Sequence, residues 1–518
     1  MRSVVLSGFM ATGKSTVGRL VANELALPFV DVDAVIAEQT GKAVGEVFAG
    51  EGEARFRDRE ADIVRPLLSD GTARVIAFGG GTVTIPSIRH AALEAATVVT
   101  LTANPEAIVS RATSVKERPN LGARSPVDRA RDLLALRREA YGECHASVAT
   151  DGLEPQEIAR RVVEIARRDL LAMPLGTRSY AVEVTAAAPA RLSDTIAELA
   201  PSSLLVVTDS NVRAACGEWL DAALAPHSAL PTHVVEIPPG EAHKNIATVT
   251  RIWDEALAKG VDRKTLVLGF GGGVVGDLAG FVASTLLRGV RCVHIPTTLL
   301  SMVDSSVGGK TGFDHAQGKN LIGAFFQPSH VVIDLHHLAT LPPREMAAGH
   351  AEIVKIALAC DAKLLAMLEH GGSLGAIVRG AVQAKIRVVR DDEREAGVRA
   401  LLNLGHTVGH ALESFGGFSR WLHGEAVAIG TVLEIEACER LGLTPVGTAK
   451  RADALLSRVG LPTRVSRDEL LAAWPHVLAD KKRSGDTVAQ AVVTGDGEAH
   501  VERIALDRLR DAVAAGLT

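Results

Sequence analysis

The sequence predicts an α/β protein of three structural parts, and three observations support this. Short apolar runs alternate with amphipathic segments through residues 1–168 and again from about 178 to 340, as in parallel sheets with helices on both faces. From residue 341 to the end, Ala, Leu and Glu recur at helical spacing, which predicts an all-helical domain. A chain of 518 residues also exceeds what one hydrophobic core usually holds.

The first part begins with a predicted strand at residues 4–6, and two more strands are predicted at 75–78 and 97–101. The carboxyl ends of parallel strands meet at one edge of a sheet, so the segments that follow them should line one crevice. A helix from about 155 to 172 ends this part, and Met173-Pro174-Leu175-Gly176 breaks it. The predicted domains are 1–168, 178–340 and 341–518, with 169–177 as a short linker.

The second part opens with a predicted strand at residues 180–184. Its runs at 204–208 and 265–268 are apolar throughout, which is typical of strands buried on both faces of a parallel sheet. Strand and helix alternation around such strands predicts a Rossmann-like, nucleotide-binding domain.

Composition and charge indicate a globular protein without a general attraction for polyanions. Hydrophobic residues make up 47% and charged residues 23% of the chain, and its net charge of −5 argues against binding to nucleic acid or an anionic membrane. The five cysteines are far apart and form no Cys-x-x-Cys pair, so neither a disulfide framework nor a thiolate metal cage is expected. We expect no export signal, no membrane span and a cytoplasmic location.

A phosphate-binding loop is predicted between the first strand and the first helix. Gly8-Phe9-Met10-Ala11-Thr12-Gly13-Lys14-Ser15 fits the pattern in which backbone amides cradle nucleotide phosphates. Lys14 would bridge the terminal phosphates of ATP, and Ser15 would place its hydroxyl on Mg²⁺. The residues expected to bind the nucleotide are Gly8, Gly13, Lys14, Ser15 and Thr16.

Two carboxylates, Asp31 and Asp33, follow the apolar residues 28–30. If this segment is extended, side chains two residues apart point the same way. One carboxylate could then lie in the Mg²⁺ shell while the other orients the hydroxyl that accepts the phosphoryl group. We assign these roles to Asp31 and Asp33 respectively.

Phe56-Arg57, Gly79-Gly80-Gly81, Arg118-Pro119 and Arg137 complete an ordered set, with which residues 1–168 resemble shikimate kinase. The resemblance implies that the arginines pair with the shikimate carboxylate, that Asp33 positions the attacking hydroxyl and that the lid residue Arg118 approaches the transferring phosphate. It also places Arg111 against adenine. The chain departs from the family at Val32 and Asn120, where threonine and leucine are usual. The residues implied to bind shikimate are Asp33, Arg57, Gly80, Gly81 and Arg137.

A second chemistry is indicated by the glycine-rich run 271–277 and by the polar groups that end neighbouring apolar segments at 208–211 and 239–244. Glycines at a helix start let a dinucleotide pyrophosphate approach the backbone. The residues expected to bind a dinucleotide, completed by the resemblance described next, are Asp209, Asn211, Glu241, Lys244, Gly272, Gly273, Asp277, Thr297, Thr298, Asp304, Lys310, Lys319 and Asn320.

Three histidines lie close together in the sequence, at His406, His410 and His423, the last followed by Gly424-Glu425. Spacing alone makes His406 and His410 joint metal ligands, since residues four apart share a helix face. Residues 271–281, 349–355, 402–410 and 423–425, however, resemble 3-dehydroquinate synthase, and the likeness extends over about residues 178–500. It implies Zn²⁺ or Co²⁺ at Glu352, His406 and His423, with His410 contacting the substrate and NAD⁺ as a resident cofactor.

The same resemblance implies that a heptulosonate phosphate is converted to 3-dehydroquinate with release of phosphate, and that the protein is a homodimer through this half. A dianionic substrate would explain many cations in one cleft. Glu395, Arg399 and Asn403 recur every four residues, so one helical face could present them. His350 and Leu286 depart from the family pattern. The residues carried over are Arg288, Lys310, Lys355, Lys385, Glu395, Arg399, Asn403, His410 and Lys481.

The main interpretation is therefore a bifunctional enzyme that joins an ATP-dependent kinase to an NAD- and metal-dependent synthase. One alternative is a synthase with a non-catalytic nucleotide-binding regulatory domain. Another is a metal-dependent alcohol dehydrogenase joined to another small-molecule kinase, although Lys310, Lys319 and Asn320 would then lack a phosphate to bind.

Overall fold

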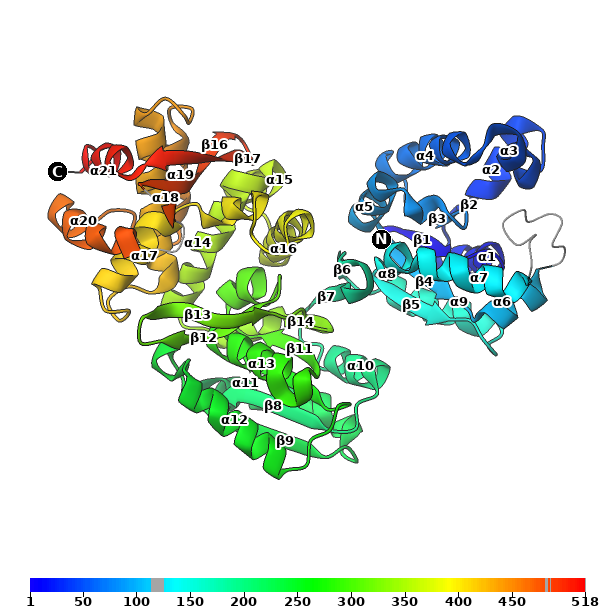
Figure 1. Cartoon of the computed structure of the whole chain (residues 1–518), viewed down its shortest axis with the longest axis horizontal. Coiled ribbons are helices and arrows are strands. Elements are labelled where there is room, and N and C mark those ends of the chain that lie inside the picture. Colours follow the sequence, from blue (N-terminus) through cyan, green and yellow to red (C-terminus); the bar gives the residue numbers. More distant parts are fainter. Residues whose placement is uncertain (113–124, 480–482, 485, 518) are drawn as a thin grey trace. The chain divides into compact units, whose positions relative to one another are not determined.

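The computed structural model describes residues 1–112, 125–479, 483–484 and 486–517 (Figure 1). The chain forms two compact units, Met1–Glu183 and Val184–Thr518. The predicted linker at 169–177 lies inside the first unit. The finer division into three domains stays a prediction.

The first unit is built on a parallel sheet with strand order β2-β3-β1-β4-β5. Alternate side chains of β1 face opposite layers: Val4 and Leu6 pack with α1 and α9, whereas Val5 packs in the core formed with α2 to α7. The predicted parallel sheet with helices on both faces is confirmed. Its strands are β1 (Ser3–Gly8), β2 (Phe29–Asp31), β3 (Val75–Ala77), β4 (Ala96–Thr102) and β5 (Ala146–Ala149).

Most helices of this unit follow a strand and return the chain to the start of the next one. They are α1 (Lys14–Leu25), α2 (Val32–Thr40), α3 (Val44–Glu51), α4 (Glu53–Ser69), α5 (Pro86–Ala95), α6 (Pro105–Arg111), α7 (Pro126–Leu136), α8 (Arg138–Gly142) and α9 (Pro155–Ala166). The short 3₁₀ turn η1 (Thr82–Thr84) follows β3.

The predicted helix at 155–172 is too long, because α9 ends at Ala166. Residues Leu170–Met173 instead form β6, which pairs antiparallel with β7 (Tyr180–Thr185), and the turn η3 (Gly176–Arg178) lies between them. Pairing buries all four residues of β6, so tertiary packing overrides the helical propensity of Leu, Ala and Met. A buried ion pair between Arg168 and Glu183, at 2.7 Å, closes the strand pair.

The second unit contains the parallel strands β14-β11-β10-β8-β9, in that order. Leu204 and Val206 of β8 pack with α10 and α11, while Leu205 and Val207 pack with α12 and α13. This is the predicted Rossmann-like arrangement. Its strands are β8 (Leu204–Asp209), β9 (Thr232–Ile237), β10 (Leu266–Gly271), β11 (Arg291–Pro296) and β14 (His330–Asp334), and β12 (Lys310–His315) and β13 (Gly318–Phe325) form a separate hairpin.

The helices around these strands are α10 (Ala190–Leu199), α11 (Ser210–Leu224), α12 (Ile246–Ala258) and α13 (Gly273–Thr285). Short turns connect them to the strands. These are η4 (Ala225–His227), η5 (Glu241–His243), η6 (Leu286–Arg288), the π-helical turn η7 (Ser301–Ser305) and η8 (Leu335–Thr340).

The rest of the second unit is mainly helical, as predicted, and the structure adds a three-stranded antiparallel sheet, β15-β16-β17. The hairpin of β16 and β17 turns at Asp496-Gly497, a turn signal that the helical prediction overlooked. The elements are α14 (Pro343–Cys360), α15 (Ala362–His370), α16 (Leu374–Asp391), η9 (Val398–Asn403), α17 (His406–Phe415), α18 (His423–Arg440), α19 (Thr448–Arg458), α20 (Arg467–Ala473), η10 (Trp474–Ala479), β15 (Arg483–Ser484), β16 (Thr487–Gly495), β17 (Glu498–Ala505) and α21 (Leu506–Ala514).

No helix in the described part of the chain is long and apolar enough to cross a membrane.

The buried imidazole of His337 makes stability depend on pH. The ring packs edge-on against Trp219 and Phe270, with centroids 4.7 and 5.5 Å away, and within the described residues neither ring nitrogen has a hydrogen-bond partner. Burial, partly opposed by the carboxylate of Asp334, lowers the pKa of His337 to about 4. The folded protein therefore keeps this ring neutral where the unfolded chain binds a proton.

Stability should fall as the pH drops from about 6.5 towards 4, because protons then bind preferentially to the unfolded state. Replacing His337 by Phe keeps a ring in the cluster and should reduce the number of protons taken up on unfolding by up to about one. Thermal unfolding of both proteins between pH 7 and 5 measures this difference. Parallel pH profiles would contradict the prediction.

Candidate active sites

The phosphate loop in the first unit joins the end of β1 to the start of α1. Gly13 precedes the helix, and Lys14, Ser15 and Thr16 form its first turn. The ammonium of Lys14 is buried and donates to the carbonyls of Gly8 and Phe9, at 2.9 and 2.8 Å. Lys14 is thus held inside the loop, within reach of any phosphate that the backbone amides would bind.

The glycine turn after β3 brings together the residues predicted to hold the acceptor. A Cβ added at Gly79 would overlap the carboxylate of Glu60 and lie 2.9 Å from Oδ1 of Asp33. One added at Gly81 would overlap the Arg57 guanidinium. Side chains from α2 and α4 therefore pack directly on this turn.

Two more groups reach the same turn, one from the residue before α8 and one from its last turn. Arg137 donates from Nη1 to the Gly80 carbonyl at 3.0 Å, and the hydroxyl of Tyr141 donates to the same oxygen. Gly80 also lies against the phosphate loop, because a Cβ there would come within 3.3 Å of the amide nitrogen of Met10. The predicted acceptor residues Asp33, Arg57, Gly80, Gly81 and Arg137 thus converge beside the nucleotide loop.

Two members of this cluster, Glu60 and Tyr141, are not predicted from the sequence. Glu60 is fully buried and accepts hydrogen bonds from Arg57 at 2.5 Å and from the hydroxyl of Thr82 at 2.6 Å. The available signal was spacing, since Glu60 follows Arg57 by three residues and Tyr141 follows Arg137 by four.

The prediction that Asp31 and Asp33 lie on one extended segment is wrong, because the chain is not extended beyond Asp31. Helix α2 begins at Val32, and the Asp31 carboxylate caps it by accepting the backbone N–H of Asp33 at 3.1 Å. Val32 is fully buried in the core, which accounts for an apolar residue at this position.

Arg111 ends α6 and donates to Thr150, the residue after β5, through both guanidinium nitrogens at 2.9 Å. It therefore lies at the carboxyl edge of the sheet, as a nucleotide contact would require. Arg118, Asn120 and Lys481 lie outside the described residues.

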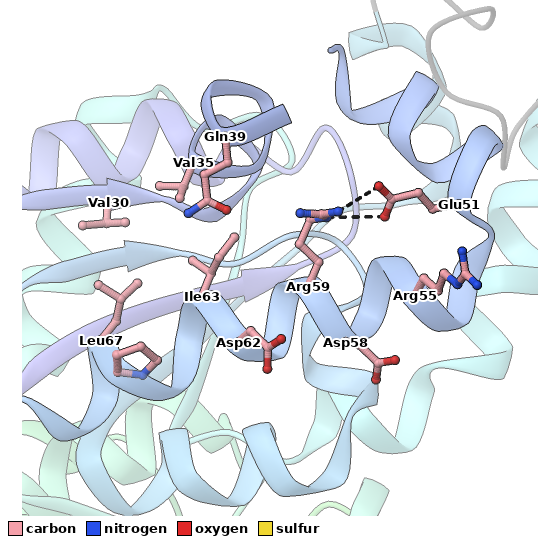
Figure 2. Close-up of a pocket in the computed structure, with 11 residues that line it drawn as sticks. Val30, Val35, Gln39, Glu51, Arg55, Asp58, Arg59, Asp62, Ile63 and Leu67 are labelled. Atoms are coloured by element: carbon pink, nitrogen blue, oxygen red, sulfur yellow. Dashed lines mark hydrogen bonds and ion pairs between the residues drawn. The ribbon is translucent and has the colours of Figure 1, made fainter. Parts of the chain in front are cut away.

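A cavity in this unit is separate from the acceptor cluster. It measures about 750 Å³ and lies between α2, the end of α3 and α4, where Arg59 pairs with Glu51 at 2.8 Å (Figure 2). The residues of α4 that line it, such as Arg55 and Asp62, occupy the helix face opposite to Arg57 and Glu60.

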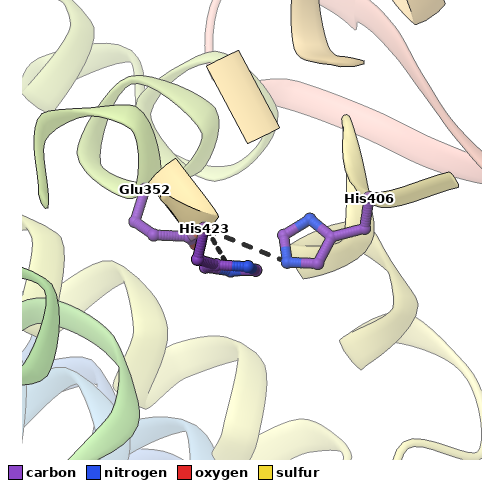
Figure 3. A group of neighbouring side chains, drawn as sticks. All are labelled: Glu352, His406 and His423. Carbon is purple, nitrogen blue, oxygen red and sulfur yellow. Dashed lines mark ion pairs between the residues drawn. The ribbon is translucent and has the colours of Figure 1, made fainter. Parts of the chain in front are cut away.

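In the second unit, Glu352, His406 and His423 bring their ligand atoms within 4.8 Å of one another (Figure 3). Oε1 of Glu352 lies 3.8 Å from Nε2 of His406 and 3.5 Å from Nε2 of His423. This oxygen is buried and has no hydrogen-bond partner among the described residues. An orphaned carboxylate oxygen facing two imidazole nitrogens fits a divalent cation.

The other nitrogen of each histidine makes a hydrogen bond, which orients the ring so that Nε2 points to Glu352. Nδ1 of His406 lies 3.2 Å from the carbonyl of Leu404, and Nδ1 of His423 lies 3.0 Å from the carboxylate of Glu413. Both histidines are the first residues of their helices. The buried carboxylate of Glu434 anchors α17 by accepting the backbone N–H groups of Gly405 and Val408, at 2.8 and 2.9 Å.

A second set, His410, Glu413 and His423, also brings its ligand atoms within 4.8 Å of one another. The ring centroids of His406 and His410 are 5.1 Å apart, so the two rings are neighbours, but neither ligand set among the described residues contains both, as joint ligation would require. Glu425, by contrast, turns away from the cluster and pairs with Arg344 at 2.7 Å.

The electrostatic environment of the cluster favours positive charge. Burial lowers the pKa of His423, but Glu413 and Glu352 outweigh it and raise the pKa to about 10. Burial raises the pKa of Glu413, yet the positive charge of His423 and that of Lys319 bring it to about 2. A cation bound here would replace the proton of His423.

Buried cations surround the cluster. The ammonium of Lys355 pairs with Glu352, and that of Lys385 pairs with Asp304, on the turn η7. Burial lowers the pKa of Lys385 to about 8, although the attraction of Asp304 opposes this shift. Both ammonium groups are therefore buried beside the predicted metal ligands.

Glu395 and Asn403 are hydrogen-bonded to each other, but the predicted single helical face is wrong. Glu395 lies in an irregular segment with a positive φ of 59°, and η9 begins only at Val398. Asn403 donates to Glu395 at 2.7 Å, Glu395 also binds the ammonium of Lys310, and Arg399 donates to the carbonyl of Gly308 at 3.1 Å.

The residues predicted to bind a dinucleotide gather where β10 meets α13. Gly272 and Gly273 begin α13, Thr297 donates its backbone N–H to Gly271 at 3.0 Å, and a Cβ at Gly272 would lie 3.1 Å from the methyl of Thr298. Asp209 caps α11, whose second residue is Asn211.

Two lysines connect the predicted dinucleotide site to groups on neighbouring elements. Lys244 is buried and contacts Asp277 at 2.5 Å and Asn320 at 2.6 Å. Lys319 lies 3.5 Å from Glu241 and 3.3 Å from Glu413, so it links the dinucleotide side to the histidine cluster.

Arg288 is predicted to bind the substrate, and His350 is expected beside the synthase site. The contacts of the described residues do not join Arg288 to the cluster: it ends η6, where Leu287 and Arg288 both have positive φ, at 51° and 68°. His350 approaches the carbonyl of Met346 in its own helix, at 2.9 Å.

Both units are similar to known protein families. The sequence profile of shikimate kinase matches residues 10–167, and those of the N-terminal and C-terminal parts of 3-dehydroquinate synthase match residues 234–348 and 349–483. The 3-dehydroquinate synthase of Azotobacter vinelandii is 46% identical over 347 residues, which cover 63% of this chain and 93% of the relative.

Two solved structures are also similar. The 2-epi-5-epi-valiolone synthase of Streptomyces hygroscopicus, solved with NAD⁺ and Zn²⁺ bound, is 31% identical over 65% of this chain and 96% of its own, with a TM-score of 0.57. Shikimate kinase from Acinetobacter baumannii, solved with shikimate, is 32% identical over 32% of this chain and 92% of its own, with a TM-score of 0.31.

The hydrogen bond between Glu413 and His423 should set metal affinity. Glu413→Gln removes the negative charge opposite Nδ1 of His423 and is expected to weaken Zn²⁺ binding by about 10- to 100-fold. Competition with a chromogenic chelator measures the affinity. Glu436→Gln, which changes a half-buried carboxylate of α18 that pairs with Arg440 and Arg464, is the matched control and should bind normally.

Glu352→Gln distinguishes the two overlapping ligand sets. It should abolish tight Zn²⁺ binding if Glu352, His406 and His423 hold the ion. Normal binding by this variant, together with complete loss in Glu413→Gln, would assign the ion to His410, Glu413 and His423 instead.

Proposed function

This chain belongs to the 3-dehydroquinate synthase family and carries a shikimate kinase domain before it, so it is a bifunctional enzyme of the shikimate pathway, and we propose how its residues divide the two reactions. The first phosphorylates shikimate with ATP. The second cyclises 3-deoxy-D-arabino-heptulosonate 7-phosphate to 3-dehydroquinate and releases phosphate. The observation that carries this assignment is the convergence of each predicted residue set in its own unit.

In the kinase site, the backbone amides of the loop and Lys14 bind the phosphates of ATP, and Ser15 holds Mg²⁺ with Asp31 nearby. Lys14 exchanges the carbonyls of Gly8 and Phe9 for phosphate oxygens, so part of its desolvation is already complete in the free protein. The terminal phosphate then lies beside the glycine turn 79–81.

Shikimate lies on the other side of that turn. Arg57 and Arg137 pair with its carboxylate, and Asp33 accepts the proton of the attacking hydroxyl. The buried carboxylate of Glu60 fixes the Arg57 guanidinium in this orientation. Arg118 completes the site as a lid residue, and Arg111 lies against adenine.

In the synthase site, Glu352, His406 and His423 hold the metal ion, and the groups around β10 and α13 hold NAD⁺. A zinc or cobalt ion held there would supply a Lewis acid for adjacent hydroxyl and carbonyl oxygens, and bound NAD⁺ would supply hydride transfer. The residues fit a metal because the orphaned oxygen of Glu352 faces an Nε2 nitrogen of each of two histidines.

The cations around the cluster bind the anionic substrate. Lys355, Lys385 and Arg399 are buried and form a positive lining. The resemblance adds Lys310, Arg288 and Lys481 to the substrate-binding set. Glu395 and Asn403 orient Lys310 and hydroxyl groups. His410, beside both metal-binding rings, contacts the substrate and moves a proton at its imidazole.

We also propose a cytoplasmic homodimer formed through the synthase half. All five cysteines are free thiols, which suits a reducing compartment. The alternatives of a regulatory nucleotide-binding module and of an alcohol dehydrogenase gain no support, because the acceptor residues and the phosphate-binding cations are both assembled.

Lys14→Ala should lower shikimate-dependent ADP formation by about 100-fold or more, because the terminal phosphates lose their charged donor. Synthase activity of the same preparation should be unchanged. A coupled ADP assay with and without shikimate measures the first reaction, and release of inorganic phosphate from the heptulosonate phosphate measures the second. Loss of both activities would contradict independent sites.

His406→Ala should give the reciprocal result. Phosphate release from the heptulosonate phosphate should fall to background and the bound zinc should fall with it, since the site loses one of its three protein ligands. Kinase activity should remain. Full zinc content with normal synthase activity would rule out His406 as a ligand.

A further inference from the structure

Helix α8 lies between the glycine turn 79–81, the acceptor turn, and the segment that leads out of the kinase domain. This segment, residues 174–179, follows β6 and contains the turn η3. On one side of α8, Arg137 and Tyr141 donate to the Gly80 carbonyl. Its other side faces the outgoing segment.

Two carboxylates of the α8 region hold this segment by its backbone. Glu139 accepts the N–H of Thr177 at 2.7 Å, and Glu143, just after the helix, accepts the N–H of Gly176 at 3.1 Å. Hydrogen bonds from backbone N–H groups to carboxylates are stronger than neutral ones. The outgoing segment is therefore fixed to α8 and is not a free tether.

The packing between the two backbones is close. Gly176 has a φ of 61°, and a Cβ there would overlap the Glu139 carboxylate. A Cβ on Gly142 would lie 2.7 Å from the Gly176 carbonyl. Within the segment, Ser179 accepts the N–H of Leu175 at 2.9 Å and donates to the carbonyl of Gly176 at 2.6 Å, which keeps the turn rigid.

Glu143 also connects to the acceptor turn through Arg89. Its carboxylate binds Arg89 at 2.5 Å, and Arg89 donates to the carbonyl of Val83, two residues after Gly81, at 2.6 Å. The side of α8 that binds the outgoing segment is thus connected to both ends of the turn on which shikimate is proposed to lie.

We propose that Glu139 and Glu143 are positioning residues of the kinase: by docking residues 175–179 on α8, they hold Arg137 and Tyr141 at the Gly80 carbonyl and so set the affinity for shikimate. The segment that continues into the synthase is then part of the kinase acceptor site. This inference rests on the proposed assignment of Arg137 to shikimate. It concerns the binding of shikimate, whereas phosphate transfer depends on the nucleotide loop.

The test uses the full chain and the variant Glu139→Ala, because Glu139 is exposed and its loss should not disturb folding. The KM for shikimate is expected to rise about 3- to 10-fold, while kcat, the KM for ATP and the synthase activity stay near wild type. Glu139→Gln, which keeps an acceptor for the N–H of Thr177, should restore most of the affinity. Glu164→Ala, in an exposed ion pair of α9, is the matched control.

Glu143→Gln provides a second, stronger variant, since it weakens both the contact with Gly176 and that with Arg89. An unchanged shikimate KM in Glu139→Ala and Glu143→Gln, with an active wild type, would overturn the inference alone. Equal losses in shikimate KM, ATP KM and kcat would also overturn it, because they indicate general destabilisation. A wild type without shikimate-dependent ADP formation would overturn the proposed kinase function and this inference together.

Discussion

The buried carboxylate of Glu352 is the constraint on which the synthase site depends. A carboxylate removed from water is tolerated only with compensating charge and hydrogen bonds. Lys355 supplies one partner from the same helix, and α17 and α18 each begin with a histidine directed at the remaining oxygen. The start of α17 is in turn fixed by another buried carboxylate, Glu434. The buried charges that hold these helices in place therefore also position the metal-binding groups.

The kinase site follows a related principle with backbone groups in place of a metal. The carbonyl of Gly80 collects two donors from α8, and the carbonyls of the nucleotide loop hold the ammonium of Lys14. Each cationic group is thus placed before substrate arrives, and substrate oxygens need only replace carbonyl oxygens. Such preorganisation lowers the cost of ordering side chains during binding.

Much of this arrangement could be predicted from sequence because its residues occur in contiguous motifs. The phosphate loop, the glycine turns and the fold class all follow from local patterns, and the resemblances supplied Glu352, which no spacing rule joins to His406. Glu60, Glu413 and Glu434 were missed because a helical glutamate looks the same whether it faces solvent or a buried site. The irregular segment around Glu395 was misjudged since four-residue spacing predicts a shared face only inside a helix. Asp31 was misjudged for a similar reason: capping ended the strand earlier than expected.

The pairing of β6 with β7 has a consequence for how the two enzymes could be separated. A break at the polar residues before Leu170 would look natural from sequence, yet it would take β6 and its partner strand together away from the rest of the first unit. In that unit Ala172 of β6 packs in the hydrophobic core, and the carbonyl of Leu170 accepts a hydrogen bond from Arg2 at 3.3 Å. A piece that ends before Leu170 would therefore expose apolar surface and tend to aggregate. The likeness to shikimate kinase ends at residue 167, so a kinase cut at the limit of that likeness would lack a strand that its fold needs.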